Sequence, residues 1–153
     1  MELAAHASLS EALHAAVPLE WPPEEVRHAL EFFAQNIEKA SHCSGWRIYY
    51  WVSQAETEAE RILIGSGGFM GAPTAEGVVT LGYGTLQRFR NKGYATEAVQ
   101  GLTAWALAQP CVKIVGAESI PENLPSMRVL QKSGFEENGP GEEEGTRSFV
   151  FRK

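Results

Sequence analysis

The stretch RFRNKGYATEA, residues 88–98, joins a predicted strand to a predicted helix. It places Gly93 in a short turn and Thr96 at the start of an amphipathic run. The first amides of a helix have no partners within the helix, and the helix dipole is positive at that end. Gly93 has no side chain to block a phosphate, and Arg90 and Lys92 add positive charge beside it. The turn therefore predicts an anion-binding site.

The same residues follow the pattern of a known family. RNKGYA, residues 90–95, fits R-x-x-G-x-G/A and resembles the pyrophosphate loop of the GNAT superfamily of acyl-CoA-dependent N-acetyltransferases. A second block, PENLPSMRVLQKSGFE from Pro121, follows in the order of that family, after one helix and one strand. This second block and the stretch LGYGTLQRFRNKGYATEAVQGL, residues 81–102, are together similar to one subgroup of the family. That subgroup includes the ribosomal-protein N-terminal acetyltransferases. Without the second block, a plain strand-to-helix connection with exposed basic residues explains the turn equally well.

The size and composition favour one domain. The chain has 153 residues, enough to bury a core, and we expect a single acetyltransferase domain over residues 1–153. No apolar run approaches the roughly 20 residues that span a bilayer, and the first residues lack the basic region of a secretory signal. Two cysteines do not indicate a disulfide framework. We therefore expect a cytoplasmic location, where acyl-CoA is also found.

The net charge and the histidine and cysteine pattern argue against nucleic-acid and metal binding. A net charge of −6 argues against nucleic-acid binding, and we expect no membrane partner either. The histidines lack metal-like spacing, and the pair His42–Cys43 would need about two more ligands for zinc. We predict no metal, and a monomer or homodimer.

The hydrophobic pattern predicts an α/β protein, and the resemblance implies the GNAT fold: a mixed, mostly antiparallel sheet with helices on both faces. Its first strand is short or missing, because only Met1–Ala4 are left to form it. The sequence predicts these elements: helices from Ser8 to about Ala16, from Glu24, over 94–108 and from Asn123 to Gly134; strands beginning near Trp46, Arg61, Ala75, Val112 and Thr146; and an acidic loop, Glu136–Gly145.

The resemblance implies acetyl-CoA as cosubstrate and assigns its contacts. In the family the strand ending at Leu86 separates from its neighbour, and the pantetheine arm lies in the gap. The backbone there would bind pantetheine and polarise the thioester carbonyl. Asn123 of N-x-x-S would contact pantetheine, although a helix N-cap explains it equally well. The implied cofactor-binding residues are Thr85, Leu86, Arg90, Asn91, Lys92, Gly93, Tyr94, Ala95, Thr96 and Asn123.

The catalytic residues are less clearly marked, because this chain departs from the family at three places, one of them Gln87 and Arg88 in place of a common Pro-Glu. Thr80 replaces a common glutamate, and Leu130 occupies the position of a tyrosine that serves as the acid in many members outside this subgroup. An amine must lose its proton to attack, and a carboxylate can take that proton directly or through a water molecule. Glu118, at the end of a predicted strand, is the remaining candidate, and a solvated strand end is the alternative. Ser126 is the candidate that protonates the leaving thiolate, or it merely occupies the first helical turn.

The function expected from these features is acetyl transfer from acetyl-CoA to a primary amine, by direct attack in a ternary complex. The acceptor suggested by the subgroup is a peptide α-amine. Two alternatives stay open: acetylation of a small amine such as a polyamine or antibiotic, and a CoA-binding sensor without catalysis. The substitutions at Thr80 and Leu130 motivate the sensor. Turnover of acetyl-CoA with a panel of amines separates the enzyme from the sensor.

Overall fold

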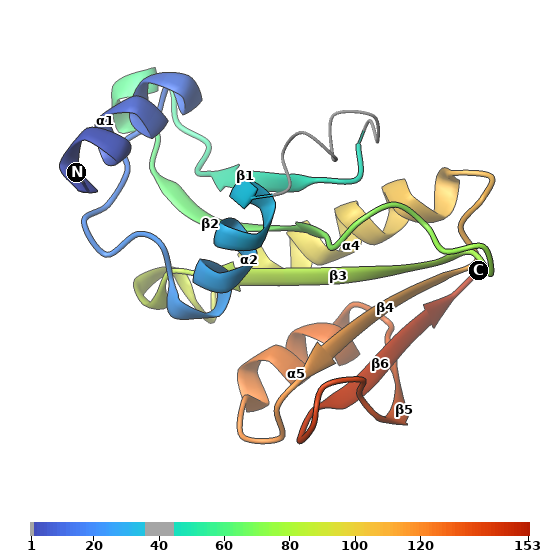
Figure 1. Ribbon diagram of the computed structural model, residues 1–153. Coiled ribbons are helices and arrows are strands. Elements are labelled where there is room, and N and C mark those ends of the chain that lie inside the picture. The colour runs from blue at the N-terminus through green and yellow to red at the C-terminus, as the bar shows by residue number, and fades with distance from the viewer. Residues whose placement is uncertain (1, 36–44) are drawn as a thin grey trace.

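The computed structural model describes residues 2–35 and 45–153, and within them six strands form one sheet (Figure 1). The strand order is β1-β2-β3-β4-β6-β5, and each neighbouring pair is antiparallel except β3 and β4. This is the mixed α/β architecture that the sequence predicts. The elements are α1 (Glu2–Leu13), α2 (Glu24–Gln35), β1 (Ile48–Val52), η1 (Glu58–Glu60), β2 (Leu63–Phe69), β3 (Val78–Thr85), η2 (Gln87–Phe89), α4 (Tyr94–Ala108), β4 (Ile114–Ser119), α5 (Leu124–Lys132), β5 (Glu136–Pro140) and β6 (Arg147–Arg152).

The N-terminal segment is helical where the fold family would have a first strand. Residues 2–4 belong to α1, so they form no strand. The helix begins at Glu2 and not at the predicted cap Ser8, because the alanine- and leucine-rich run before Ser8 favours helix. Beyond the helix, Ala16 makes an isolated parallel bridge to Ile62. That bridge joins the N-terminal segment to the chain just before β2.

Helices pack on both faces of the sheet, and β3 shows how. Successive side chains of a strand point to opposite faces. Val79 and Leu81 are buried in one cluster with Val99 of α4, so α4 covers their face. Gly84 lies on the opposite face, where a Cβ atom would stand 2.7 Å from Cγ1 of Val26 in α2. Close packing of α2 on the sheet therefore requires a glycine at this position.

The two central strands separate along their length. β3 and β4 pair in parallel from Val78 to Leu81 of β3, and β3 then continues to Thr85 without pairing to β4. Figure 1 shows the two strands meeting near the C-terminus and separating away from it. Over the last residues of β3, the backbone groups on that side have no strand partner, although β2 pairs with the other side.

The acidic segment after α5 is partly a strand, which corrects the predicted loop. Glu136–Pro140 form β5 and pair with β6 at the edge of the sheet. All five residues of β5 are exposed, so the strand lacks the apolar alternation that marks a half-buried strand in sequence. None of the described helices combines the length and apolar character that a membrane crossing requires.

Candidate active site

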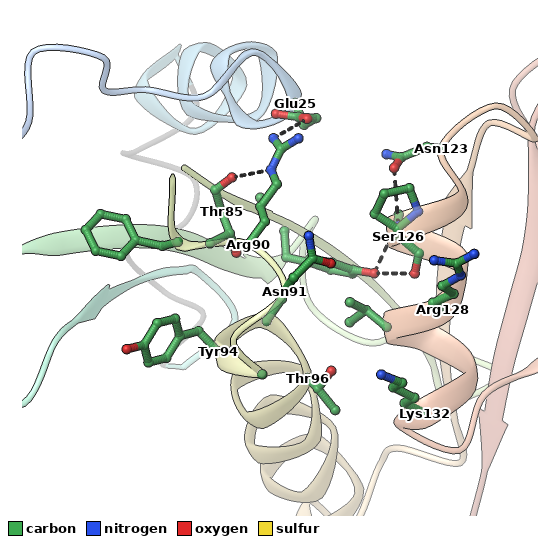
Figure 2. Close-up of a pocket in the computed structure, with 17 residues that line it drawn as sticks. Glu25, Thr85, Arg90, Asn91, Tyr94, Thr96, Asn123, Ser126, Arg128 and Lys132 are labelled. Carbon is green, nitrogen blue, oxygen red and sulfur yellow. Dashed lines mark hydrogen bonds and ion pairs between the residues drawn. The ribbon is translucent and has the colours of Figure 1, made fainter. Parts of the chain in front are cut away.

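A pocket of about 310 Å³ lies where β3 ends and where α4 and α5 begin (Figure 2). Nine of the twelve predicted site residues line it, whereas Leu86, Lys92 and Glu118 do not. The lining residues are Glu25, Tyr83, Gly84, Thr85, Phe89, Arg90, Asn91, Gly93, Tyr94, Ala95, Thr96, Asn123, Pro125, Ser126, Arg128, Val129 and Lys132. The pocket thus combines α2, β3, the turn into α4, and α5.

The turn into α4 presents backbone amides to this pocket. Gly93 is the N-cap, with φ of 86°, and no side chain caps the helix. Because the first intrahelical bond runs from the Glu97 amide to the Gly93 carbonyl, the preceding amides have no helical acceptor. A Cβ atom at Gly93 would meet no atom within 4 Å. Asn91, also with positive φ, completes the tight turn that leaves this helix end open.

The end of β3 contributes a buried hydroxyl group. Thr85 is 6% exposed, and its Oγ1 atom has no hydrogen-bond partner among the described residues. Because a buried polar group without a partner costs free energy, this hydroxyl is suited to a ligand. Leu86 differs from the prediction, because it lies in the core and its amide already donates to the Ile64 carbonyl at 2.9 Å.

Arg90 reaches across the top of the pocket to α2. Its Nε donates to the Thr85 carbonyl at 2.9 Å, and its Nη2 donates to Oε1 of Glu25 at 2.7 Å. Figure 2 shows the guanidinium between these two partners. Lys92 points elsewhere, with its ammonium 5.5 Å from the centre of the Phe89 ring. The positive charge that the sequence assigned to this turn is therefore partly neutralised by Glu25.

Two further cations come from α5, and neither was among the residues predicted from the sequence motifs. Arg128 and Lys132 are four residues apart, so they lie on one face of the helix, and both line the pocket. The sequence signal that could have indicated them is their position, four residues apart, in the helix that follows Asn123. Together with the open end of α4, they make this side of the pocket favourable for an anion.

Asn123 and Ser126 form the cap of α5, and Tyr83 joins them. Oδ1 of Asn123 accepts from the Ser126 amide at 3.2 Å, which is the N-cap interaction. The Tyr83 hydroxyl lies 3.0 Å from Oγ of Ser126 and donates to the Ser126 carbonyl at 3.0 Å. Burial raises the pKa of Tyr83 to about 12, although the Ser126 hydrogen bond acts in the opposite direction. Tyr83 is therefore protonated throughout the neutral range.

Glu118 lies outside the pocket and contacts the connection between β5 and β6. Its carboxylate accepts from the Thr146 hydroxyl at 2.6 Å and from the amides of Glu142 and Glu143 at 2.7 and 3.3 Å. Partial burial acts to raise its pKa, but the hydrogen bonds from Thr146 and the two amides outweigh burial and lower it. Glu118 is thus a weak base that orders the β5–β6 connection.

The described residues contain no group of three or more histidine, cysteine or acidic side chains arranged to hold a metal ion. The pair His42–Cys43 lies outside the described residues. Among the described side chains, the pocket is lined by three cations, one carboxylate and several hydroxyl groups. This composition is suited to binding an anion and to proton transfer through hydroxyl groups.

Comparison with known proteins identifies the family. Residues 2–136 match the family described as "Acetyltransferase (GNAT) domain". A Bacillus subtilis protein named "Uncharacterized N-acetyltransferase YjdG" is 32% identical over 116 residues, which cover 76% of this chain and 67% of the relative. The chain belongs to the GNAT family of acyl-CoA-dependent N-acetyltransferases.

Solved structures share the fold across nearly the whole chain. An acetyltransferase from Agrobacterium tumefaciens superimposes with a TM-score of 0.66 and 19% identity, covering 97% of this chain and 86% of its own. The aminoglycoside acetyltransferase AAC(6')-Ib in complex with coenzyme A gives a TM-score of 0.58 at 19% identity, covering 100% and 92%. These likenesses establish the GNAT fold, in agreement with the sequence prediction.

Proposed function

We propose that the pocket binds acetyl-CoA and that the protein transfers the acetyl group to a primary amine by direct attack in a ternary complex. The observation that carries the proposal is the uncapped N-terminus of α4, which presents free amides to a pocket beside the separated strands. The pocket fits the cofactor chemically, because it offers an anion site and the unpartnered Thr85 hydroxyl. The CoA complex of the structurally similar aminoglycoside acetyltransferase supports the same choice.

The residues divide into contacts for the two parts of the cofactor. The amides of Gly93, Tyr94, Ala95 and Thr96 would hold the diphosphate, with Arg128 and Lys132 supplying the compensating charge. The unpaired edge of β3 and the side-chain NH2 group of Asn123 would hold the pantetheine arm and direct its acyl end along β3. Bound in this way, acetyl-CoA supplies an activated acetyl thioester.

The hydroxyl groups of the pocket have a role in proton transfer. Ser126 would donate a proton to the departing thiolate, whose pKa is near 8.5. Tyr83, whose hydroxyl lies 3.0 Å from Oγ of Ser126, would replenish or orient that proton. No cysteine lines the pocket among the described residues, which favours direct transfer over an acyl-enzyme.

The proposed general base is weak and lies outside the pocket, which favours an acceptor that loses its proton easily. Glu118 is proposed as the general base, and its lowered pKa limits its strength. A peptide α-amine has a pKa near 8 and is partly neutral at physiological pH, whereas well under about 1% of a lysine amine is neutral there. The inferred acceptor is therefore a peptide α-amine.

Competition kinetics at neutral pH test the acceptor. Acetyl-CoA is supplied with short peptides that have free or blocked N-termini, with spermidine and with an aminoglycoside, and thiol release is measured. The proposal expects the free-N-terminus peptide to have the highest kcat/KM. Faster acetylation of spermidine, the aminoglycoside or a blocked, lysine-containing peptide would reassign the acceptor. Thiol release with none of these amines, despite measurable CoA binding, would favour a sensor.

A further inference from the structure

The pocket has one carboxylate that the proposed chemistry leaves without a role. Of the described residues that line the pocket, Glu25 alone carries an acidic side chain. It lies in the first turn of α2, and its Oε1 accepts from Nη2 of Arg90 at 2.7 Å. The Glu25 and Arg90 side chains are 38% and 36% exposed, so a ligand in the pocket can reach both.

Packing of α2 fixes the position of Glu25 relative to the sheet. The next residue, Val26, is 2% exposed and anchors this turn of the helix. A Cβ atom built on Gly84 would lie 2.7 Å from Cγ1 of Val26 and 3.6 Å from Cβ of Glu25. Glu25 therefore lies directly against the part of β3 that has no β4 partner. In the proposed function, the acyl end of the cofactor extends along this part of β3.

Arg90 connects Glu25 to the proposed phosphate site. It belongs to the turn that precedes α4, and it lines the same pocket as the uncapped amides of that helix. A guanidinium group binds phosphate oxygens through several parallel donors, and such bonds are stronger than neutral ones. A diphosphate on α4 and the Glu25 carboxylate would therefore compete for one cation.

We propose that Glu25 binds the amine acceptor in its protonated form, before the general base takes the proton and the neutral amine attacks, and that the diphosphate of the cofactor frees Glu25 by taking over Arg90. This inference rests on the proposed function of the pocket. Without cofactor, Arg90 neutralises Glu25. With cofactor bound, a carboxylate without its cation faces the pocket beside Gly84, and a cationic amine takes the place of the guanidinium. Cofactor then binds first, and each ligand strengthens the binding of the other.

Calorimetric titration with coenzyme A alone tests the exchange of Arg90. Glu25→Gln should bind coenzyme A about two- to fivefold more tightly than wild type, which is the scale of an exposed ion pair. In a protein that already carries Arg90→Gln, Glu25→Gln should add nothing, because the shared cation is gone. Glu24→Gln is the matched control: Glu24 pairs with Arg27 at 3.4 Å, does not line the pocket, and should leave the affinity unchanged.

The other outcomes of this titration contradict either the exchange of Arg90 or the binding of coenzyme A. Weaker binding to Glu25→Gln would make Glu25 a support for Arg90 and overturn the exchange. Equal tightening in Glu24→Gln, or tightening that persists with Arg90→Gln, would reduce the effect to general charge and also overturn it. If wild type binds no coenzyme A, the proposed function fails, and this inference fails with it.

Steady-state kinetics at saturating acetyl-CoA test the acceptor contact. For spermidine and for a peptide with a free N-terminus, Glu25→Gln should raise the acceptor KM about tenfold or more, the scale of a charge-assisted hydrogen bond, and change kcat less. Glu24→Gln should match wild type. The acceptor role of Glu25 would be overturned if wild type and Glu25→Gln had equal KM values for each amine. It would also be overturned if neither amine were acetylated although coenzyme A binding changed as expected in the calorimetric titration.

Discussion

Gly93 is important for its backbone and for the space around it. Its φ of 86° favours glycine, and a Cβ atom there would meet no protein atom within 4 Å. A side chain at this position would therefore strain the turn and add bulk beside the amides that we propose hold the diphosphate. The sequence pattern indicated the glycine, and the structure adds that the protein leaves this space empty.

Gly93→Val should lower the affinity for coenzyme A at least tenfold, while the protein still folds after a loss of about 1–2 kcal/mol from backbone strain. Thermal unfolding with and without coenzyme A measures this, since ligand at one hundred times its Kd adds about 2.7 kcal/mol to wild type. Gly101→Ala is the control, because Gly101 lies within α4 and away from the pocket. It should leave coenzyme A binding unchanged. Equal stabilisation of wild type and Gly93→Val would move the cofactor elsewhere.

Glu118 is expected to show its contribution through pH. Its folded-state pKa lies below the ordinary 4.5, so the folded protein binds this proton less tightly than the unfolded chain does. The stability that Glu118 supplies is therefore present above pH 4.5 and lost as pH falls through the lowered pKa. Glu118→Gln should lower the free energy of unfolding by up to about 1 kcal/mol near neutral pH, and by less in acid. Urea unfolding over this range measures it, and a loss independent of pH would contradict the assignment.

Turnover by the same variant separates the proposed base from a structural contact. If Glu118 accepts the proton of the amine, Glu118→Gln should lower kcat roughly 10²-fold or more with unchanged coenzyme A affinity. Thr146→Val removes one hydrogen bond to Glu118 and keeps the carboxylate, so it should have a much smaller effect. Similar losses in both variants would indicate that only the order of the β5–β6 connection matters.

At the scale of elements, α2 and β3 meet where glycine is required, and this contact should govern stability. A Cβ atom added at Gly84 would lie only 2.7 Å from Cγ1 of Val26, and valine would add further atoms there. Gly84→Val should therefore lower the free energy of unfolding by about 1–3 kcal/mol. Gly82→Ala is the matched control on the same strand, because its Cβ would lie 3.9 Å from Sδ of Met70. Denaturant unfolding of both variants checks the difference, and equal stabilities would mean that α2 does not pack tightly on β3.

The elements with strong local signals could be predicted from sequence. α4, α5 and the open turn between β3 and α4 each carry a periodic apolar pattern, a cap or a glycine, and these signals depend on neighbouring residues only. β5 could not be predicted, because the strand is fully exposed and is held by pairing with β6. Glu25 was missed for a related reason. An acidic residue in a first helical turn is ordinary, and its contact with Arg90 depends on the tertiary fold.

At the scale of the whole molecule, the separated strands divide the sheet into two parts. β1, β2 and β3 form one part, β4, β6 and β5 form the other, and the parallel pairing from Val78 to Leu81 of β3 joins them. α4 contacts β2, β3 and β4, so it packs against both parts. The pocket therefore lies at the boundary between two parts that share one helix.

The unpaired length of β3 has a consequence for how the molecule meets other chains. A strand with free backbone groups is normally a hazard, because a strand of another protein can pair with it and begin aggregation. Here the free groups lie inside the sheet, between β3 and β4, and not at its outer edge. The flanking strands restrict access to that position, so we expect a slender, flexible molecule to extend along β3 more readily than a strand of a folded protein. The unpaired edge of β3 thus faces the inside of the sheet, where we expect a narrow ligand and not a neighbouring protein to pair with it.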